Sequence, residues 1–290
     1  MPAELYLNVA VSGLLTGLIY GLSALGLSVI FGVIRIVNFA HGEIMVLGMF
    51  ATLMLFRRLG IDPLLGLPLV AALLFAFGYV LQDLVVRRVA HLAEHMQFLL
   101  MAAIAVMLIS LCLMIFGPDA QGAQVSYAYD SFAIGPLIVD KVRIYAGIAA
   151  LVVSGLLFAF FRYTATGKAI RACGDNRVGA LVVGLNVRRL FALTFGIGTA
   201  CLGAAGAIML LLVDVHPYLG PSYTLLAFII VIIGGMGSLP GAILGGVLIG
   251  LSEALAGIVL QPSLKSAFSF GLLILVLLLR PQGLLGKVGR

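Results

Sequence analysis

The chain has 290 residues, of which 63% are hydrophobic and 10% are charged, and its mean hydropathy is +1.23. A soluble domain carries about 25% charged residues, so this composition excludes a soluble globular protein and predicts an integral membrane protein. The net charge of +6 does not indicate nucleic acid binding, because cytoplasmic loops of membrane proteins carry an excess of Lys and Arg.

Nine hydrophobic segments along the chain have the lengths of membrane-crossing helices. A run such as Gly271–Leu279 lacks the alternation of a membrane β-barrel strand, and uneven segment lengths predict tilted or broken helices. We therefore expect an all-α polytopic membrane protein with about 8–10 transmembrane helices, some of them broken, in a single transmembrane domain over residues 1–290. The segments are 6–33, 40–56, 64–86, 97–117, 144–161, 190–213, 222–234, 241–257 and 267–280.

Two interruptions of the apolar pattern contain the candidate translocation path. Val215–Ser252 has no Asp, Glu, Lys or Arg and is interrupted by the glycine-rich segment Gly234–Gly241. Irregular backbone at membrane depth persists only where protein or a water-filled cavity satisfies its polar groups. The other interruption, Asn38–Glu43, either caps the following helix or lines a pore or gate. The candidate path residues are Asn38, His41, Gly42, Glu43, Gly234, Gly235, Gly237 and Ser238.

Glycines recur every four residues on two of the predicted helices. Gly13, Gly17 and Gly21 lie on one face of the first helix, and Gly246 and Gly250 have the same spacing further along the chain. Such a glycine face allows another helix backbone to approach closely. The same face could instead line a translocation path or slide against a partner.

Charges in the loops predict the orientation. The loop 162–189 carries six basic residues and Asp175, which is typical of a cytoplasmic loop, whereas loop 118–142 is acidic and is expected outside. The basic tail residues Arg280, Lys287 and Arg290 agree with a cytoplasmic carboxyl end. With nine spans, the amino terminus and the pair Arg57-Arg58 are placed outside, against the charge rule. Eight or ten spans would place the amino terminus inside.

The basic loop 162–189 also carries an apolar stripe, so we interpret it as a cytoplasmic coupling loop. An amphipathic helix at this face can lie on the membrane or dock in the cleft of a partner, and the compact glycine-containing turn favours docking. The candidate docking residues are Gly167, Lys168, Arg171, Asp175, Arg177, Ala180, Leu181, Gly184 and Asn186.

The chain has no pattern typical of an enzyme. Gly286-Lys287 lacks the rest of a phosphate-binding loop, and neither the His nor the Cys residues have zinc-ligand spacing. We therefore expect no cofactor and no metal in this chain. Energy for uphill transport would come from a partner or from an ion gradient. An ion-coupled carrier would use Glu43 or Glu253 as its proton site.

Several strings together resemble the permease subunits of branched-chain amino acid ABC transporters, the LivH type. The matching segments are Gly21–Glu43, with its Asn-Phe-Ala-His-Gly string, Gly167–Arg189, Pro217–Pro221, Ile233–Gly246 and Arg280–Gly286. The resemblance covers nearly the whole chain. The loop departs from it at Cys173-Gly174, where the family more often has a small residue followed by an acid.

The resemblance implies a polytopic helical permease in a bacterial inner membrane that moves branched-chain amino acids by ATP-driven alternating access. It also implies partners: a second, LivM-type permease subunit, two cytoplasmic ABC ATPases that bind ATP and Mg, and a periplasmic substrate-binding protein. The loop Gly167–Arg189 would dock the ATPase. Because the family also includes permeases for urea and short amides, those substrates stay open.

Overall fold

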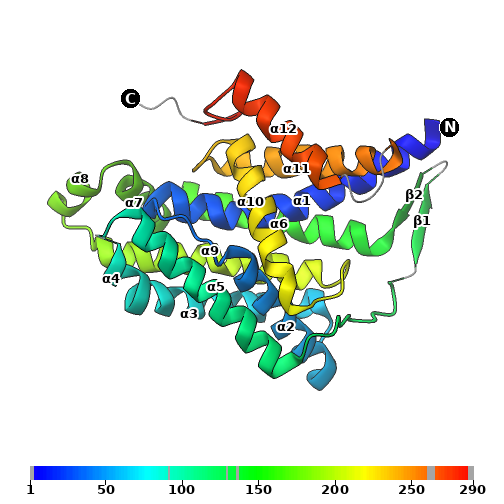
Figure 1. The fold of residues 1–290 in the computed structure, drawn as a ribbon, viewed down its shortest axis with the longest axis horizontal. Helices are drawn as coiled ribbons and strands as arrows, with labels where there is room; N and C mark the ends of the chain where they lie inside the picture. The colour runs from blue at the N-terminus through cyan, green and yellow to red at the C-terminus, as the bar shows by residue number, and fades with distance from the viewer. Residues whose placement is uncertain (1–2, 91, 129, 135–136, 260–264, 287–290) are drawn as a thin grey trace.

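The computed structural model describes residues 3–90, 92–128, 130–134, 137–259 and 265–286, and most of them are helical (Figure 1). The helices are α1 (Ala3–Ile34), α2 (His41–Leu59), α3 (Pro63–Leu81), the π-helical η1 (Gln82–Val86), α4 (Arg87–Val89), α5 (Glu94–Phe116), α6 (Lys141–Tyr163), α7 (Ala165–Asp175), α8 (Arg177–Val182), α9 (Val187–Met209), the 3-10 turn η2 (Pro217–Leu219), α10 (Gly220–Gly234), α11 (Leu239–Val259) and α12 (Lys265–Leu279). The strands β1 (Ser131–Ile134) and β2 (Leu137–Asp140) form an antiparallel hairpin with Ser131 opposite Asp140.

Every predicted span coincides with a helix. Within the described residues, seven helices are long and apolar enough to cross a membrane. The other two predicted spans, 40–56 and 267–280, correspond to α2 and α12. The first of these helices is charged at both ends and the second is short. The helices are irregular, as predicted. α3 passes into a π-helical segment, and short non-helical segments precede α2 and α11.

The turn between α2 and α3 follows from three adjacent residues. Gly60 has a φ of 66° and its N–H bonds back to the carbonyls of Leu55 and Phe56, which ends α2. Asp62 then accepts a hydrogen bond from the Leu64 N–H at 2.8 Å, and Pro63 occupies the first turn of α3, where a missing N–H costs nothing. The sequence therefore encodes a tight reversal here.

The glycine face of α1 packs directly on α11. A Cβ at Gly17 would lie 2.7 Å from the Gly246 carbonyl oxygen, and one at Gly250 would lie 2.4 Å from the Cα of Gly17. A Cβ at Gly13 would likewise collide with the Ala254 Cβ and lie 2.8 Å from the Gly250 carbonyl oxygen. The packing interpretation of this repeat is therefore confirmed, and the two helices run side by side in Figure 1.

The segment between α1 and α2 reverses direction inside the protein. Arg35 adopts the left-handed region with a φ of 59°, just after α1 ends at Ile34. The chain then returns along α1, so that His41 Nε2 lies 3.1 Å from the Ser23 carbonyl oxygen. Because Ser23 is about three helical turns before the end of α1, α2 begins in the interior of the bundle rather than at its end.

The two ends of the bundle, marked in Figure 1 by α7–α8 and by the β1–β2 hairpin, carry different numbers of basic residues. Basic residues at the end with α7 and α8 are Arg35, Arg87, Arg88, Arg162, Lys168, Arg171, Arg177, Arg188, Arg189 and Arg280, whereas those at the hairpin end are Arg57, Arg58, Lys141 and Arg143. One further basic residue, Lys265, begins α12 and is counted at neither end. The positive-inside rule therefore assigns the α7–α8 end to the cytoplasm. Lys287 and Arg290 lie outside the described residues.

The start of α1 lies at the external end, where Asn8 accepts a hydrogen bond at 2.9 Å from the N–H of Ile138 in the hairpin. Arg57 is at the same end and donates to Gln121 Oε1 at 2.6 Å. The Arg57-Arg58 pair thus lies at the same end as the start of α1, and the number of crossings stays a prediction. The exposed position of this pair lets water solvate it.

A substitution tests the close contact between α1 and α11. We expect Gly17→Leu to lower the free energy of unfolding by about 1–3 kcal/mol or more, because its side chain would displace the α11 backbone. Thermal unfolding of the detergent-solubilised protein measures this effect. Gly155→Leu on α6 is the control, since nothing lies within 4 Å of a Cβ there. Equal melting temperatures for the two variants would contradict the packing argument.

Candidate functional site

The polar start of α2 is buried between α1 and α10. Asn38 and His41 are 0% exposed and Glu43 is 4% exposed. Thr224 on α10 holds this segment: its hydroxyl donates to Glu43 Oε2 at 3.1 Å and accepts from the Gly42 N–H at 2.8 Å. A residue larger than glycine at position 42 would collide with the backbone of Gly220. One hydroxyl therefore pairs with both a backbone N–H in the first turn of α2 and the buried carboxyl group of Glu43.

Asn38 and His41 each make one hydrogen bond and leave one polar atom without a partner. Asn38 Oδ1 accepts from the Ala40 N–H at 3.0 Å in the turn before α2, and His41 Nε2 donates to the Ser23 carbonyl. The predicted capping of α2 by Asn38 is wrong, because the residue at the N-cap is Ala40 and no side chain caps this helix from that position. Among the described residues, Asn38 Nδ2 and His41 Nδ1 have no hydrogen-bond partner. Buried polar atoms are usually paired, so these two atoms are available to water or to a ligand once space opens.

A small cavity lies beside this segment. Its volume is about 10 Å³, and its lining includes Tyr20, Ser23, Met45, Met209 and Tyr223. A space of this size holds at most about one water molecule. The region between α1, α2, α9 and α10 is therefore closed in this conformation, and no amino acid fits without movement of the helices.

The second break does not lie beside the first. Gly237 packs on Gly32 near the cytoplasmic end of α1, and Gly235 packs on Gly286 of the tail. Ser238 Oγ accepts the Gly241 N–H at 3.2 Å, so this residue caps the start of α11. In this structure Gly234–Ser238 forms a turn at the Gly32 end of α1, with Gly234 and Gly235 buried, whereas Asn38–Glu43 lies beside Ser23 in the interior of the bundle. That both breaks line a path stays a prediction.

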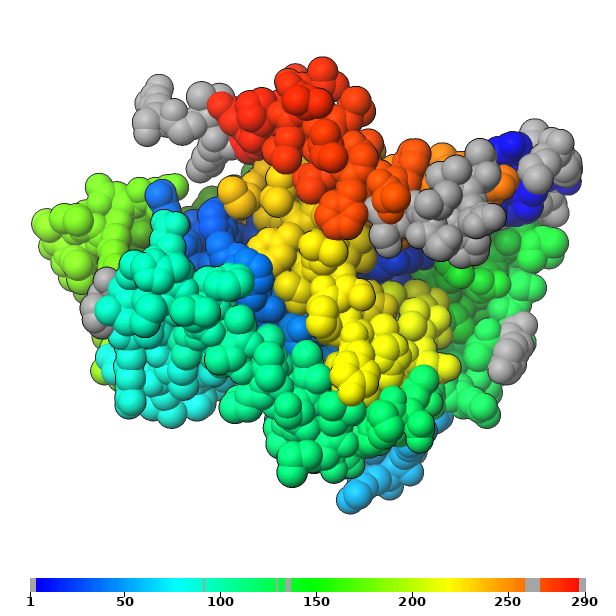
Figure 2. Space-filling view, in the orientation of Figure 1, coloured from blue at the N-terminus to red at the C-terminus, as the bar shows by residue number. Residues whose placement is uncertain are grey.

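The coupling loop folds into α7 and α8, each with a side-chain cap. Thr164 accepts the Gly167 N–H at 3.0 Å and Asn176 accepts the Gly179 N–H at 2.9 Å, while Asn186 caps α9 by accepting the Arg189 N–H at 3.1 Å. These caps end one short helix and begin the next, which gives the loop a defined shape. Figure 2 shows this region, in yellow-green, projecting from one end of the molecule.

The loop buries one apolar set and exposes another. Ile170, Cys173 and Ala180 are buried, whereas Val178 and Val182 are 71% and 82% exposed. Among the candidate docking residues, Gly167 and Ala180 face inward, and the exposed ones are Lys168, Arg171, Asp175, Arg177, Leu181, Gly184 and Asn186. The outward apolar surface is therefore at α8. Burial raises the pKa of the Cys173 thiol, which keeps it protonated at neutral pH.

The departure from the family pattern at Cys173-Gly174 has a structural counterpart. A Cβ on Gly174 would lie 3.0 Å from the Gly32 carbonyl oxygen and 3.2 Å from the Cα of Val33. The loop thus packs closely on the cytoplasmic end of α1. In this conformation a larger side chain at position 174 would separate α7 from α1.

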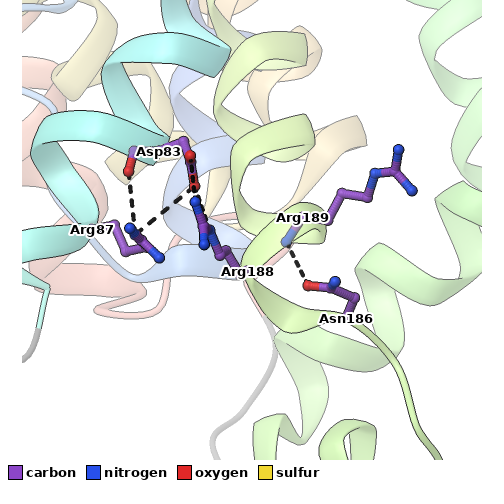
Figure 3. Close-up of polar contacts among 5 residues, drawn as sticks. All are labelled: Asp83, Arg87, Asn186, Arg188 and Arg189. Carbon is purple, nitrogen blue, oxygen red and sulfur yellow. Dashed lines mark hydrogen bonds and ion pairs between the residues drawn. The ribbon is translucent and has the colours of Figure 1, made fainter.

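An ion pair links the coupling region to η1, the π-helical segment that follows α3 (Figure 3). Arg188 donates through Nε and Nη2 to the two carboxylate oxygens of Asp83 at 2.7 and 2.8 Å. Arg87, four residues along the chain, also pairs with Asp83 at 3.8 Å, but Arg188 is the nearer partner. Sequence reasoning missed Arg188 because it lies 105 residues away, and it missed Thr224, 182 residues from Gly42, for the same reason.

A substitution at Thr224 tests the buried site. Thr224→Val keeps the volume of the side chain but leaves the Gly42 N–H and the Glu43 carboxyl without this hydroxyl, so we expect a loss of stability of about 1–3 kcal/mol. Thr52→Val is the matched control, because the equally buried Thr52 hydroxyl bonds only to the Gly48 carbonyl of its own helix, at 2.8 Å. Thermal unfolding that is equally affected in both variants would count against the bridging role.

Comparison with known proteins agrees with this architecture. The family model of the permease component of branched-chain amino acid transport systems matches residues 9–277. The chain is 32% identical to the high-affinity branched-chain amino acid transport permease LivH of Salmonella typhimurium and to that of Escherichia coli K12, with 97% of this chain and 96% of each relative covered. It is 31% identical to BraD of Pseudomonas aeruginosa over the same shares.

No solved structure matches the chain. The family match, the relatives and the apolar helices together establish a multi-pass protein of the bacterial inner membrane that works as a transport subunit and not as an enzyme. Other components of such a transport system are therefore its partners. The chain belongs to the family of permease components of branched-chain amino acid transport systems.

Proposed function

We propose that this chain is one of two permease subunits of an ABC importer for branched-chain amino acids. The observation that carries the proposal is the buried polar start of α2, Asn38–Glu43, in a chain of this permease family. It provides a few polar atoms within an otherwise apolar interior. A branched-chain amino acid needs this combination, because its side chain is apolar while its ammonium and carboxylate groups require polar partners.

The path would open where α1, α2 and α10 meet. In the closed conformation Asn38 Nδ2 and His41 Nδ1 lack partners among the described residues, and the adjacent cavity holds at most about one water molecule. Separation of α1 from α10 would enlarge this cavity and let substrate or water bond to both atoms. Asn38, His41, Gly42 and Glu43 are the proposed path residues, whereas Gly234, Gly235, Gly237 and Ser238 serve as a cytoplasmic hinge between α10 and α11.

Movement from the cytoplasm would reach this path through α1. The α7 helix packs on Gly32 and Val33 at the cytoplasmic end of α1, and Ser23 of the same helix bonds to His41. A displacement of α7 and α8 therefore pulls on the helix that holds the start of α2. Alternating access would follow when the ATPases close and push this loop.

The proposed partners are those that the family resemblance implies. They are a second, LivM-type permease subunit, two cytoplasmic ABC ATPases that dock on the loop 162–189, and a periplasmic substrate-binding protein. ATP and Mg would be held by the ATPases, and this chain would need no cofactor. The exposed apolar residues of α8, flanked by Arg171 and Arg177, suit the cleft of such an ATPase.

Uptake by the reconstituted complex tests the function. We expect ATP-dependent uptake of labelled leucine, isoleucine and valine that persists with a protonophore, and no competition by urea or acetamide. Uptake that survives ATP removal but collapses with the protonophore would instead support an ion-coupled carrier that uses Glu43 or Glu253. Competition by urea or acetamide would move the substrate to the amide class.

A charge on α8 tests the docking surface. Val182→Asp places a carboxylate where an apolar contact is proposed, so we expect at least a tenfold loss of ATPase co-purification and of ATP-driven uptake. Leu59→Asp at the external end of α2 is the control, because Leu59 is 65% exposed and distant from the loop. If the Val182→Asp variant retained the ATPase at the wild-type level, α8 would not be part of the docking interface.

A further inference from the structure

A groove of about 350 Å³ lies at the cytoplasmic end of the bundle, between the end of α3 and the start of α9. Its walls combine apolar side chains with charge. Residues that line it include Gln82, Arg87, Arg177, Leu181, Arg188 and Phe191. The groove is separate from the buried start of α2, and neither the path nor the docking surface uses it as a whole.

The groove has an excess of positive charge. Arg87, Arg177 and Arg188 all line it, and Asp83 is the acid among its lining residues. Asp83 is bound on both oxygens by Arg188, as Figure 3 shows, so one arginine charge is neutralised locally. The guanidinium of Arg177 lies over the Phe191 ring at 5.3 Å, which holds it at the groove. Arg87 also contacts Asp83, with its Nε 3.8 Å from Oδ1. The groove therefore has three arginines for one carboxylate, and this excess of positive charge favours an anion there.

Gln82 lines this groove and is a buried polar residue. Gln82 is 2% exposed, and its Oε1 has no hydrogen-bond partner within the part of the chain that the structure describes. Leaving such an atom unpaired is unfavourable, and an O–H donor from a ligand would satisfy it. Gln82 also begins the π-helical segment η1, a departure from regular helix that is frequent at functional sites.

The surroundings favour a lipid rather than a soluble anion. Leu84 and Val85 on η1 are 53% and 37% exposed, so the outer side of this segment carries apolar surface next to the groove residues Gln82 and Arg87. Leu181 and Phe191 add apolar walls within the groove. Basic pockets between helices on the cytoplasmic side of membrane proteins bind anionic lipid headgroups.

We propose that this groove binds the headgroup of an anionic phospholipid of the cytoplasmic leaflet, with a phosphate between Arg87 and Arg177 and a headgroup hydroxyl on Gln82 Oε1. Phosphatidylglycerol has both groups. Because Arg87 follows α3 and Arg177 begins α8, the bound lipid would bridge the transmembrane bundle and the coupling loop. The site is independent of which substrate is transported.

Titration of the purified full-length chain in detergent with short-chain phosphatidylglycerol tests the site, with phosphatidylcholine and inorganic phosphate as separate arms. We expect phosphatidylglycerol to bind and Arg87→Gln/Arg177→Gln to weaken it about 25-fold, or about fivefold for each arginine, which corresponds to about 1 kcal/mol per cation. Gln82→Met should weaken binding about fivefold through loss of one hydrogen bond.

The control variant Arg162→Gln/Arg189→Gln removes the same charge from the same end of the molecule. Arg189 points away from the Asp83 cluster in Figure 3, and neither arginine lines the groove. If both double variants lost phosphatidylglycerol affinity equally, binding would reflect general electrostatic attraction to this end of the molecule. That result would overturn the proposed site. Binding of inorganic phosphate as tightly as phosphatidylglycerol would overturn the lipid assignment. If the double variant does not fold, Arg177→Gln alone changes an exposed residue and keeps the test decisive.

Discussion

The structure depends on one constraint: a helix that begins at membrane depth must have its first N–H groups satisfied by the protein itself. α2 begins beside Ser23, in the interior of the bundle, and Thr224 supplies the hydrogen bond that Gly42 needs. This requirement brings α10 against α2 so closely that only glycine fits at position 42. The position of α1, α2 and α10 relative to one another therefore follows from a small number of polar contacts.

The same contacts place function and stability in one region. Glu43 is buried and receives the Thr224 hydroxyl, while Asn38 and His41 each keep an unpaired atom in the described structure. An interior that is fully paired would resist opening. Here the unpaired atoms favour any conformation that admits water or substrate, and the closed cavity beside them is the place where such a conformation would begin.

The sequence predicts the helices well because lipid imposes a simple rule on them. The predicted segment 6–33 corresponds to α1, Ala3–Ile34. Its glycine repeat forms the contact of α1 with α11. The apolar pattern of the coupling loop does not distinguish Ile170 and Ala180, which face inward, from Val182, which is exposed. Tertiary contacts explain what was missed. The turn at Arg35, the bridge from Thr224 and the pair of Asp83 with Arg188 join distant positions that periodicity does not relate.

The tail also has a mechanical consequence. The N–H groups of Leu284 and Leu285 bond to the carbonyls of Ile233 and Gly234 at 2.8 and 3.0 Å, at the turn that joins α10 to α11. Gly235 and Gly283 are in backbone contact there. Any rotation of α10 about its own axis must therefore carry this tail along or break both bonds. Residues after the last helix thus constrain how far α10 can turn relative to α11.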